Sequence, residues 1–272
     1  MFPQLGLKAS SDPAQIEDRL KYHPQTFEFF TDVHNFTPAG LAELKAGIRS
    51  VQGTGIDQIV IHQPMKFGDI HSELAAPQTA FPDLYDFIER STATLLELAS
   101  EFDLQILIHG GYSGDFPRVI PFYQSLEAAQ AAVLNRLDRF QELGGTHIMF
   151  ENSISEFFAY GNPVTERAIL DHGYRLAFDT SHCFIYLHGD NDALCASLAK
   201  LKDQVVHYHL VDSMGQSHDS LPLGTGKIDW ARVWPLLNPR ATNIYEINLA
   251  DQTDCQEQLA SHRYLTLSLI HI

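Results

Sequence analysis

Cysteine and long apolar runs are both scarce in this sequence of 272 residues. Its three cysteines, Cys183, Cys195 and Cys255, form no CxxC pair, which argues against a disulfide framework and against a thiolate zinc site. No apolar run approaches the ~18 residues that a membrane-spanning helix needs. The first residues also lack the basic and apolar segments of an export signal. We therefore expect a cytoplasmic protein without membrane association.

Positive charge is the other scarcity. The chain has 18 Lys and Arg residues against 34 Asp and Glu residues, a formal net charge of −16, and no basic cluster. Proteins that bind long polyanions need Lys and Arg on the binding face, because phosphate neutralisation supplies most of their nonspecific affinity. The charge balance therefore argues against nucleic acid as a partner.

Strand-like apolar runs alternate with helix-like segments along the whole chain, which is the pattern of a parallel α/β fold. Pro82–Phe102 is a clear amphipathic helix, because its apolar residues recur at spacings of three and four. The Gly-rich phosphate loop of an open doubly wound sheet is absent after the first strand. We predict one domain over residues 1–272, an α/β barrel of the (β/α)8 TIM type. The predicted strands are Phe2–Leu7, Thr26–Thr31, Gln58–His62, Leu104–His109, Thr146–Glu151, Arg175–Asp179, Val205–Val211 and Thr242–Ile247.

Most of these strands end on or beside a carboxylate or an imidazole. Because the ends of parallel strands point the same way, these groups are expected to meet at one rim of the barrel. A single acid there would simply reach water, but three acids and a histidine from separate strands favour a divalent-metal site. Oxygen and imidazole donors suit Mn, Mg, Co or Zn. The predicted metal ligands are Glu151, Asp179, His209 and Glu246.

Other histidines are candidates for further roles at the same rim. His62 and His109 either line the pocket or hold a second metal with Glu151 as a bridging carboxylate. His182 follows the sixth predicted strand, and His218 lies in the loop after the seventh. Both are candidates for substrate binding or for an auxiliary metal.

Two long non-helical stretches, 63–81 and 212–227, follow the third and seventh predicted strands. Long loops inside compact domains are more often functional than not, and barrel active sites lie on the face that these loops form. Tyr112 and Trp230 are candidates to cover the apolar face of a sugar, with simple packing as the alternative.

These residues carry a family resemblance. The series of strand ends, the step Asp179-Thr-Ser-His182, and His209-Leu-Val-Asp212 followed by Leu221-Pro-Leu-Gly-Thr-Gly-Lys-Ile-Asp-Trp230 resemble the xylose isomerase-like barrel superfamily. That superfamily includes sugar isomerases, ketose 3-epimerases, inosose dehydratases and the apurinic endonuclease IV group. The resemblance covers nearly the whole chain in order and spacing.

Similarity to the ketose 3-epimerases implies that Glu151, Asp179, His209 and Glu246 bind one divalent metal. It also implies that Glu151 and Glu246 are the catalytic acid and base, on opposite faces of the reacting carbon. The expected function is a metal-dependent isomerase or epimerase that acts on a sugar, keto-sugar or related polyol. One departure is that these epimerases typically place an arginine in the loop after strand seven, where this chain has His218.

Three other functions stay open. One is a dehydratase or lyase on an inositol-like keto-sugar, and another is a barrel that binds a metal or ligand without catalysis. The third is an endonuclease IV-like zinc phosphodiesterase on abasic DNA. Its third zinc needs an Asp-x-His pair, where this chain has His218 and Ser220. The missing phosphate-gripping motif favours a free sugar, and a homo-oligomeric state is left open.

Overall fold

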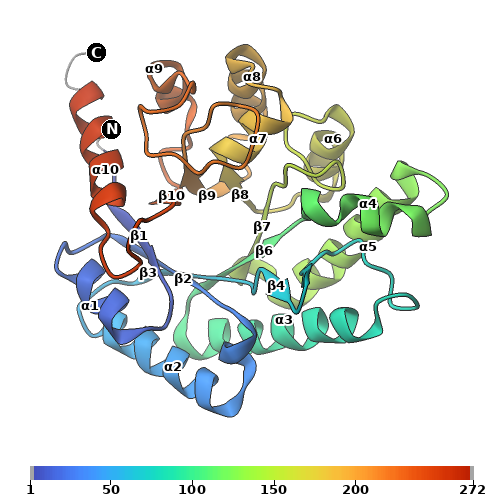
Figure 1. Cartoon of the computed structure of the whole chain (residues 1–272), viewed down its shortest axis with the longest axis horizontal. Helices are drawn as coiled ribbons and strands as arrows, with labels where there is room; N and C mark the ends of the chain where they lie inside the picture. Colours follow the sequence, from blue (N-terminus) through green and yellow to red (C-terminus); the bar gives the residue numbers. More distant parts are fainter. Residues whose placement is uncertain (1–2, 270–272) are drawn as a thin grey trace.

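Eight parallel strands form a nearly closed barrel with helices around it (Figure 1). The computed structural model describes residues 3–269. Neighbouring strands are hydrogen-bonded in the order β1-β2-β3-β6-β7-β8-β9-β10. This is the fold that the alternation of strand and helix predicts. The strands are β1 (Gly6–Ala9), β2 (Thr26–Phe30), β3 (Gln58–His62), β6 (Gln105–His109), β7 (Ile148–Glu151), β8 (Leu176–Asp179), β9 (Val205–Leu210) and β10 (Thr242–Tyr245).

The helices begin where the sequence supplies capping residues. Asp12 caps the first helix and Thr37 the second, each followed by a proline at the first helical position. Within the described residues, no helix is both long and apolar enough to cross a bilayer. The helices are α1 (Pro13–Leu20), α2 (Pro38–Gln52), α3 (Pro82–Phe102), α4 (Phe116–Val119), α5 (Leu126–Gly144), α6 (Pro163–His172), α7 (Thr180–Tyr186), α8 (Asn191–Leu201), α9 (Trp230–Val233) and α10 (Gln256–Leu269).

The barrel closes where β1 meets β10. The Nδ2 atom of Asn243 donates a hydrogen bond of 3.2 Å to the carbonyl of Gln4, just before β1. A Cβ atom at Gly6 would lie only 1.7 Å from the carbonyl oxygen of Asn243. Only glycine allows the two backbones to approach this closely.

Two layers of inward-facing side chains determine where the chemistry lies. Side chains alternate between the two faces of a strand, so residues two apart point to the same side. The lower layer is apolar and consists of Val60, Leu107, Met149 and Ala177. The upper layer lies two residues later on the same strands, and it consists of His62, His109, Glu151 and Asp179.

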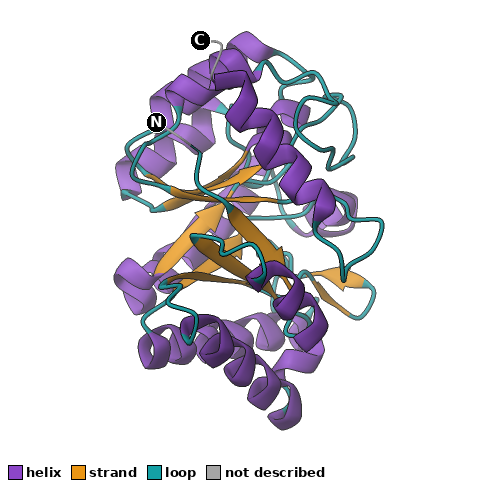
Figure 2. Cartoon of the chain, turned by 90° about the vertical axis from the view of Figure 1, so that its left-hand side faces the viewer, coloured by secondary structure: helices purple, strands orange, loops and turns teal. Residues whose placement is uncertain are grey.

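Some predicted bounds were wrong. The first strand was predicted at Phe2–Leu7, but β1 runs over Gly6–Ala9 because its pairing with β2 begins at Gly6. Phe2 lies outside the described residues. Helix α7 was not predicted. The long stretch 63–81 contains an antiparallel hairpin of β4 (Lys66–Phe67) and β5 (Ile70–His71), which stands apart from the barrel strands in Figure 2.

Candidate metal centre and pocket

Glu151, Asp179, His209 and Glu246 come together at the carboxyl ends of β7, β8, β9 and β10. One donor atom of each lies within 4.8 Å of the others. The Nδ1 atom of His209 is at the centre: it lies 2.5 Å from Glu246 Oε2, 3.1 Å from Glu151 Oε1 and 3.9 Å from Asp179 Oδ2. The pairing of Asp179 with His209 across β8 and β9 places two of these residues side by side.

Several donor atoms in this group have no hydrogen-bond partner among residues 3–269. They are both carboxylate oxygens of Glu151 and the Nδ1 atom of His209, and all are buried. The Nε2 atom of His209 instead faces Glu28 Oε2 at 2.9 Å, so the carboxylate of Glu28 holds the ring proton on Nε2. Once Nδ1 loses its own proton, its lone pair would point toward the three acids. These buried atoms otherwise meet only as ion pairs with one another, and this set of oxygen and nitrogen atoms fits a divalent cation.

The opposite charges of His209 and the neighbouring carboxylates shift one another's pKa values. Burial alone would raise the pKa of Glu151, but the positive charge of His209 outweighs it and holds that pKa well below its usual range. Burial would lower the pKa of His209, yet Glu28 and Glu246 raise it well above its usual value. A metal ligand must be neutral imidazole, so we expect a divalent ion to bind with release of a proton from His209.

Asp179 has a structural role as well as a place in the centre. Its Oδ1 atom caps helix α7 by accepting hydrogen bonds from the backbone N–H of His182 at 2.7 Å and from Ser181 Oγ at 2.8 Å. Its Oδ2 atom stays available on the side of His209. The cap also turns the chain so that His182 faces the same cavity as the metal centre.

A second group of candidate ligands consists of His109, Glu151 and His182. The sequence predicted His62 and His109 with Glu151. His62 does approach Glu151, with its Nε2 atom 3.2 Å from Oε2, while its Nδ1 atom donates to the carbonyl of Gln63 at 2.7 Å. Burial lowers the pKa of His109 to about 3, so this imidazole is neutral.

His218 reaches back from the loop after β9 to the same cavity. Its Nε2 atom lies 3.0 Å from the Nε2 atom of His182. Burial would lower the pKa of His182, but the carboxylates of Asp179 and Glu151 raise it. Burial and the neighbouring His182 lower the pKa of His218. One imidazole of this pair therefore donates to the other.

These groups line a pocket of about 280 Å³. Its outer wall includes Tyr112, a candidate from the sequence, and His71, which the sequence did not single out. The Nδ1 atom of His71, on the β4–β5 hairpin, lies 2.6 Å from Asp115 Oδ2. The ring of Tyr112 lies between the rings of His71 and His109, stacked on both, with centroids 4.7 and 4.4 Å away. Other lining residues are His62, Glu151, Ser153, His182, His218 and Glu246.

Trp230 has the packing role rather than the sugar-covering one. It is buried, and its Nε1 atom donates a 3.0 Å hydrogen bond to Asp212 Oδ2. Asp212 also accepts backbone N–H bonds from Ser213, Gly224 and Ile228, which fixes the loop that carries His218. Of the two aromatic candidates, Tyr112 alone lines the pocket.

Lys8 and Glu28 are the functional candidates that the sequence prediction missed. Both are buried inside the barrel, and they are paired with each other across β1 and β2. The Nζ atom of Lys8 lies 3.1 Å from Glu28 Oε1 and makes a closer contact with Glu246 Oε1. Burial disfavours the ammonium group, but Glu246 and Glu28 outweigh that effect and raise the pKa of Lys8 above its usual value.

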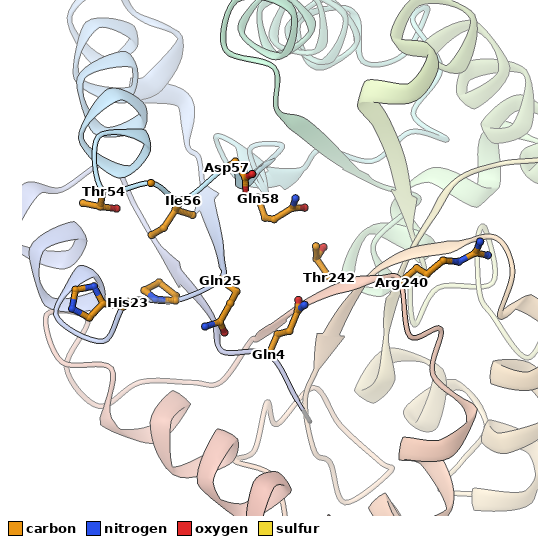
Figure 3. Close-up of a pocket in the computed structure, with 11 residues that line it drawn as sticks. Gln4, His23, Gln25, Thr54, Ile56, Asp57, Gln58, Arg240 and Thr242 are labelled. Atoms are coloured by element: carbon orange, nitrogen blue, oxygen red, sulfur yellow. The ribbon is translucent and has the colours of Figure 1, made fainter. Parts of the chain in front are cut away.

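A different hollow lies at the amino-terminal end of the strands (Figure 3). Its volume is about 450 Å³, larger than the pocket above, and it is lined by Gln25, Gln58, Arg240 and Thr242 among others. None of the three groups of candidate metal ligands found among the described residues lies there. We place the candidate site by its chemistry, at the carboxyl ends of the strands.

Glu73 fixes the loop of the outer wall and gives a prediction on pH. It is buried, and it accepts backbone N–H bonds from Ala75 at 2.9 Å and from Tyr112 at 2.7 Å. Burial raises its pKa from 4.5 to about 7. The folded protein therefore binds this proton more tightly than the unfolded chain, so stability falls as pH rises from 4.5 to 7. The full effect is about 3 kcal/mol.

We expect Glu73→Gln to flatten that decline. Urea unfolding of the protein and the variant at pH values between 5 and 8 measures it, and the difference between the two curves isolates Glu73 from the other titrating groups. The free energy of unfolding of the variant should increase relative to that of the unmodified protein as pH rises, and the difference should become constant above pH 7. Parallel curves would show that Glu73 titrates at its ordinary pKa.

Comparison with known proteins agrees with the fold. A family model described as a xylose isomerase-like TIM barrel matches residues 25–250. The chain belongs to this family.

Solved structures of similar fold have low sequence identity to this chain. A D-tagatose 3-epimerase-like protein has a TM-score of 0.69 with 18% identity, covering 98% of this chain and 99% of its own. The 3-keto-D-glucoside 4-epimerase of E. coli has a TM-score of 0.65 with 16% identity, covering 97% and 99%.

An uncharacterised protein of Methanocaldococcus jannaschii is 27% identical over 141 residues. That match covers 50% of this chain and 51% of the relative, so it spans about half the length of each. The likenesses to the two solved structures support the fold.

Proposed function

We propose that this barrel is a divalent-metal-dependent isomerase or epimerase that moves a proton on a sugar or keto-sugar. The observation that carries the proposal is the placement of two carboxylates, Glu151 and Glu246, around the same imidazole nitrogen of His209. Both carboxylates line one pocket of about 280 Å³, a size suited to a small ligand. The two epimerases of similar fold are named for sugar substrates, which agrees with this proposal.

In this proposal Glu151, Asp179, His209 and Glu246 hold the ion. A divalent ion held by these residues would supply Lewis-acid polarisation of a substrate carbonyl, which would acidify the neighbouring C–H bond. Glu151 and Glu246 extend from the ends of two different strands, β7 and β10. In this proposal one takes the proton from the substrate carbon and the other returns a proton to the opposite face. Glu28 keeps His209 in the tautomer that leaves Nδ1 free.

The other lining residues bind and orient the sugar. His182 and His218 offer imidazole nitrogens on one side of the pocket, 3.0 Å apart. The ring of Tyr112 is covered on both faces by His71 and His109, so it forms a fixed part of the pocket wall rather than a stacking face for the sugar. With a neutral His109 and an acidic rim, the pocket suits a hydroxyl-rich neutral ligand better than a phosphate ester.

Deuterium exchange tests the proposal. The protein is treated with a chelator, reloaded with Mn²⁺ and incubated in D₂O with D-fructose, D-tagatose, D-psicose and 3-keto-glucosides. NMR should show deuterium at the carbon beside the carbonyl and the appearance of an epimer or isomer. Chelated protein and metal alone serve as controls.

The products also separate the alternatives. A product lighter by one water molecule would indicate that the protein is a dehydratase, using the same acid and base, rather than an epimerase. Metal binding without exchange or turnover on any of these sugars would count against the proposal and favour a non-catalytic barrel.

A further inference from the structure

A buried lysine lies in direct contact with the candidate metal centre. Among residues 3–269, Lys8 is the only buried lysine, and it comes from β1, a strand that supplies none of the candidate ligands. Its Nζ atom contacts one carboxylate oxygen each from Glu28 and Glu246.

Lys8 and His209 each contact the carboxylates of both Glu28 and Glu246. On each carboxylate, Lys8 contacts one oxygen and His209 the other. On Glu246, Lys8 contacts Oε1 and His209 lies 2.5 Å from Oε2. On Glu28, Lys8 lies 3.1 Å from Oε1 and His209 lies 2.9 Å from Oε2. The four side chains form a closed ring of alternating charge inside the barrel.

The charge balance of this ring depends on Lys8. Four carboxylates gather here, and burying them without a compensating cation would be costly. The buried carboxylates of Glu28, Glu151 and Asp179 are joined by that of Glu246, which is 28% exposed. An ammonium group beside Glu246 also repels any second cation that approaches the same carboxylate.

We propose that Lys8 is an internal counter-cation that balances Glu28 and Glu246 in the metal-free barrel and weakens the binding of a divalent ion to the carboxylate centre. The proposal rests on the metal site of the proposed function. It predicts a barrel that is folded without metal and that exchanges its ion, rather than one that holds it permanently.

The test compares Mn²⁺ affinity and thermal stability in matched variants. Lys8→Met keeps the length of the side chain and removes its charge, whereas Lys8→Arg keeps the charge. After chelation, Lys8→Met should melt at a lower temperature than the unmodified protein. In Mn²⁺ titrations by calorimetry its dissociation constant should be at least about tenfold lower, because the repelling charge is gone. Lys8→Arg should stay close to the unmodified protein in both measurements.

A surface variant controls for the loss of one positive charge anywhere on the protein. Lys45 forms an ion pair with Glu101 at 2.6 Å, on partly exposed side chains. Lys45→Met should leave both the Mn²⁺ affinity and the melting temperature nearly unchanged, because exposed pairs contribute little.

A second pair of variants covers the case in which Lys8→Met fails to fold without metal. Glu28→Gln should bind Mn²⁺ more weakly than the unmodified protein, and adding Lys8→Met in that background should tighten binding at least about tenfold. Equal or weaker binding on loss of Lys8 in either background overturns the proposal and makes Lys8 an anchor for Glu246. If the unmodified protein binds no divalent ion, the metal site of the proposed function fails, and the counter-cation role fails with it.

Discussion

Replacing Glu151 with glutamine is expected to abolish stabilisation by Mn²⁺ while leaving a folded barrel. Glu151 belongs to two of the groups of candidate ligands, and neither of its oxygens has a hydrogen-bond partner among the described residues. At an ion concentration 100 times the dissociation constant, binding adds about 2.7 kcal/mol to the free energy of unfolding. For a chain of this size that is a rise of roughly 5 to 10 °C in melting temperature. The variant should show almost none of it.

Thermal melting with and without Mn²⁺ measures this effect, with circular dichroism as the check on folding. Glu166→Gln is a matched control, because Glu166 in helix α6 is also buried but bonds to Ser197 and Lys200 of helix α8. The control should have a lower melting temperature than the unmodified protein, and Mn²⁺ should raise that temperature by the full amount. If Mn²⁺ still raises the melting temperature of Glu151→Gln by several degrees, Glu151 is not a ligand of the ion.

Barrel geometry explains why the four ligands predicted from the sequence lie together in the structure. Strand ends are easy to locate when an apolar run stops at an acid or a histidine, as at Glu151 and Asp179. Parallel strands then bring those ends to one rim whatever their separation in the chain. The fold prediction and the convergence of the four predicted ligands both follow from this single regularity.

Lys8 and Glu28 were missed for a related reason. They lie in the middle of their strands, in Leu7-Lys8-Ala9 and Phe27-Glu28-Phe29, whereas the predicted site residues lie at strand ends. The sequence did contain a signal. The flanking apolar residues pack outside the barrel, Ala9, Phe27 and Phe29 in the main core and Leu7 in a smaller cluster, so the charged residue between them faces the barrel interior. A charged side chain in that position needs a partner, and each is the partner of the other.

The outer wall of the pocket was beyond sequence reasoning. His71 and Asp115 are 44 residues apart, and their contact depends on how two irregular loops fold against each other. Neither loop has a periodic pattern from which direction could be inferred. The link between those loops, through Glu73 and the backbone of Tyr112, also leaves no mark in the sequence.

The largest expected effect on catalysis is that of Glu246→Gln, which should lower turnover by about a thousandfold or more at saturating Mn²⁺. General acid–base catalysis contributes about 10² to 10⁴ in rate, and glutamine keeps the shape of the side chain without its basicity. Lys8 and His209 would still surround the amide, so the barrel should fold. Initial rates with the best substrate of the deuterium screen measure the loss, and an unchanged rate would exclude Glu246 from proton transfer.

The same variant separates a two-base mechanism from a one-base mechanism. If Glu151 and Glu246 serve opposite faces of the carbon, Glu246→Gln keeps one working base. It should then still exchange the proton of one epimer with D₂O, without converting that epimer into the other. The second epimer, whose proton faces residue 246, should exchange at least a hundredfold more slowly than with the unmodified protein. Equal loss of exchange from both epimers would mean that a single carboxylate handles both faces, and it would identify Glu246 as that base.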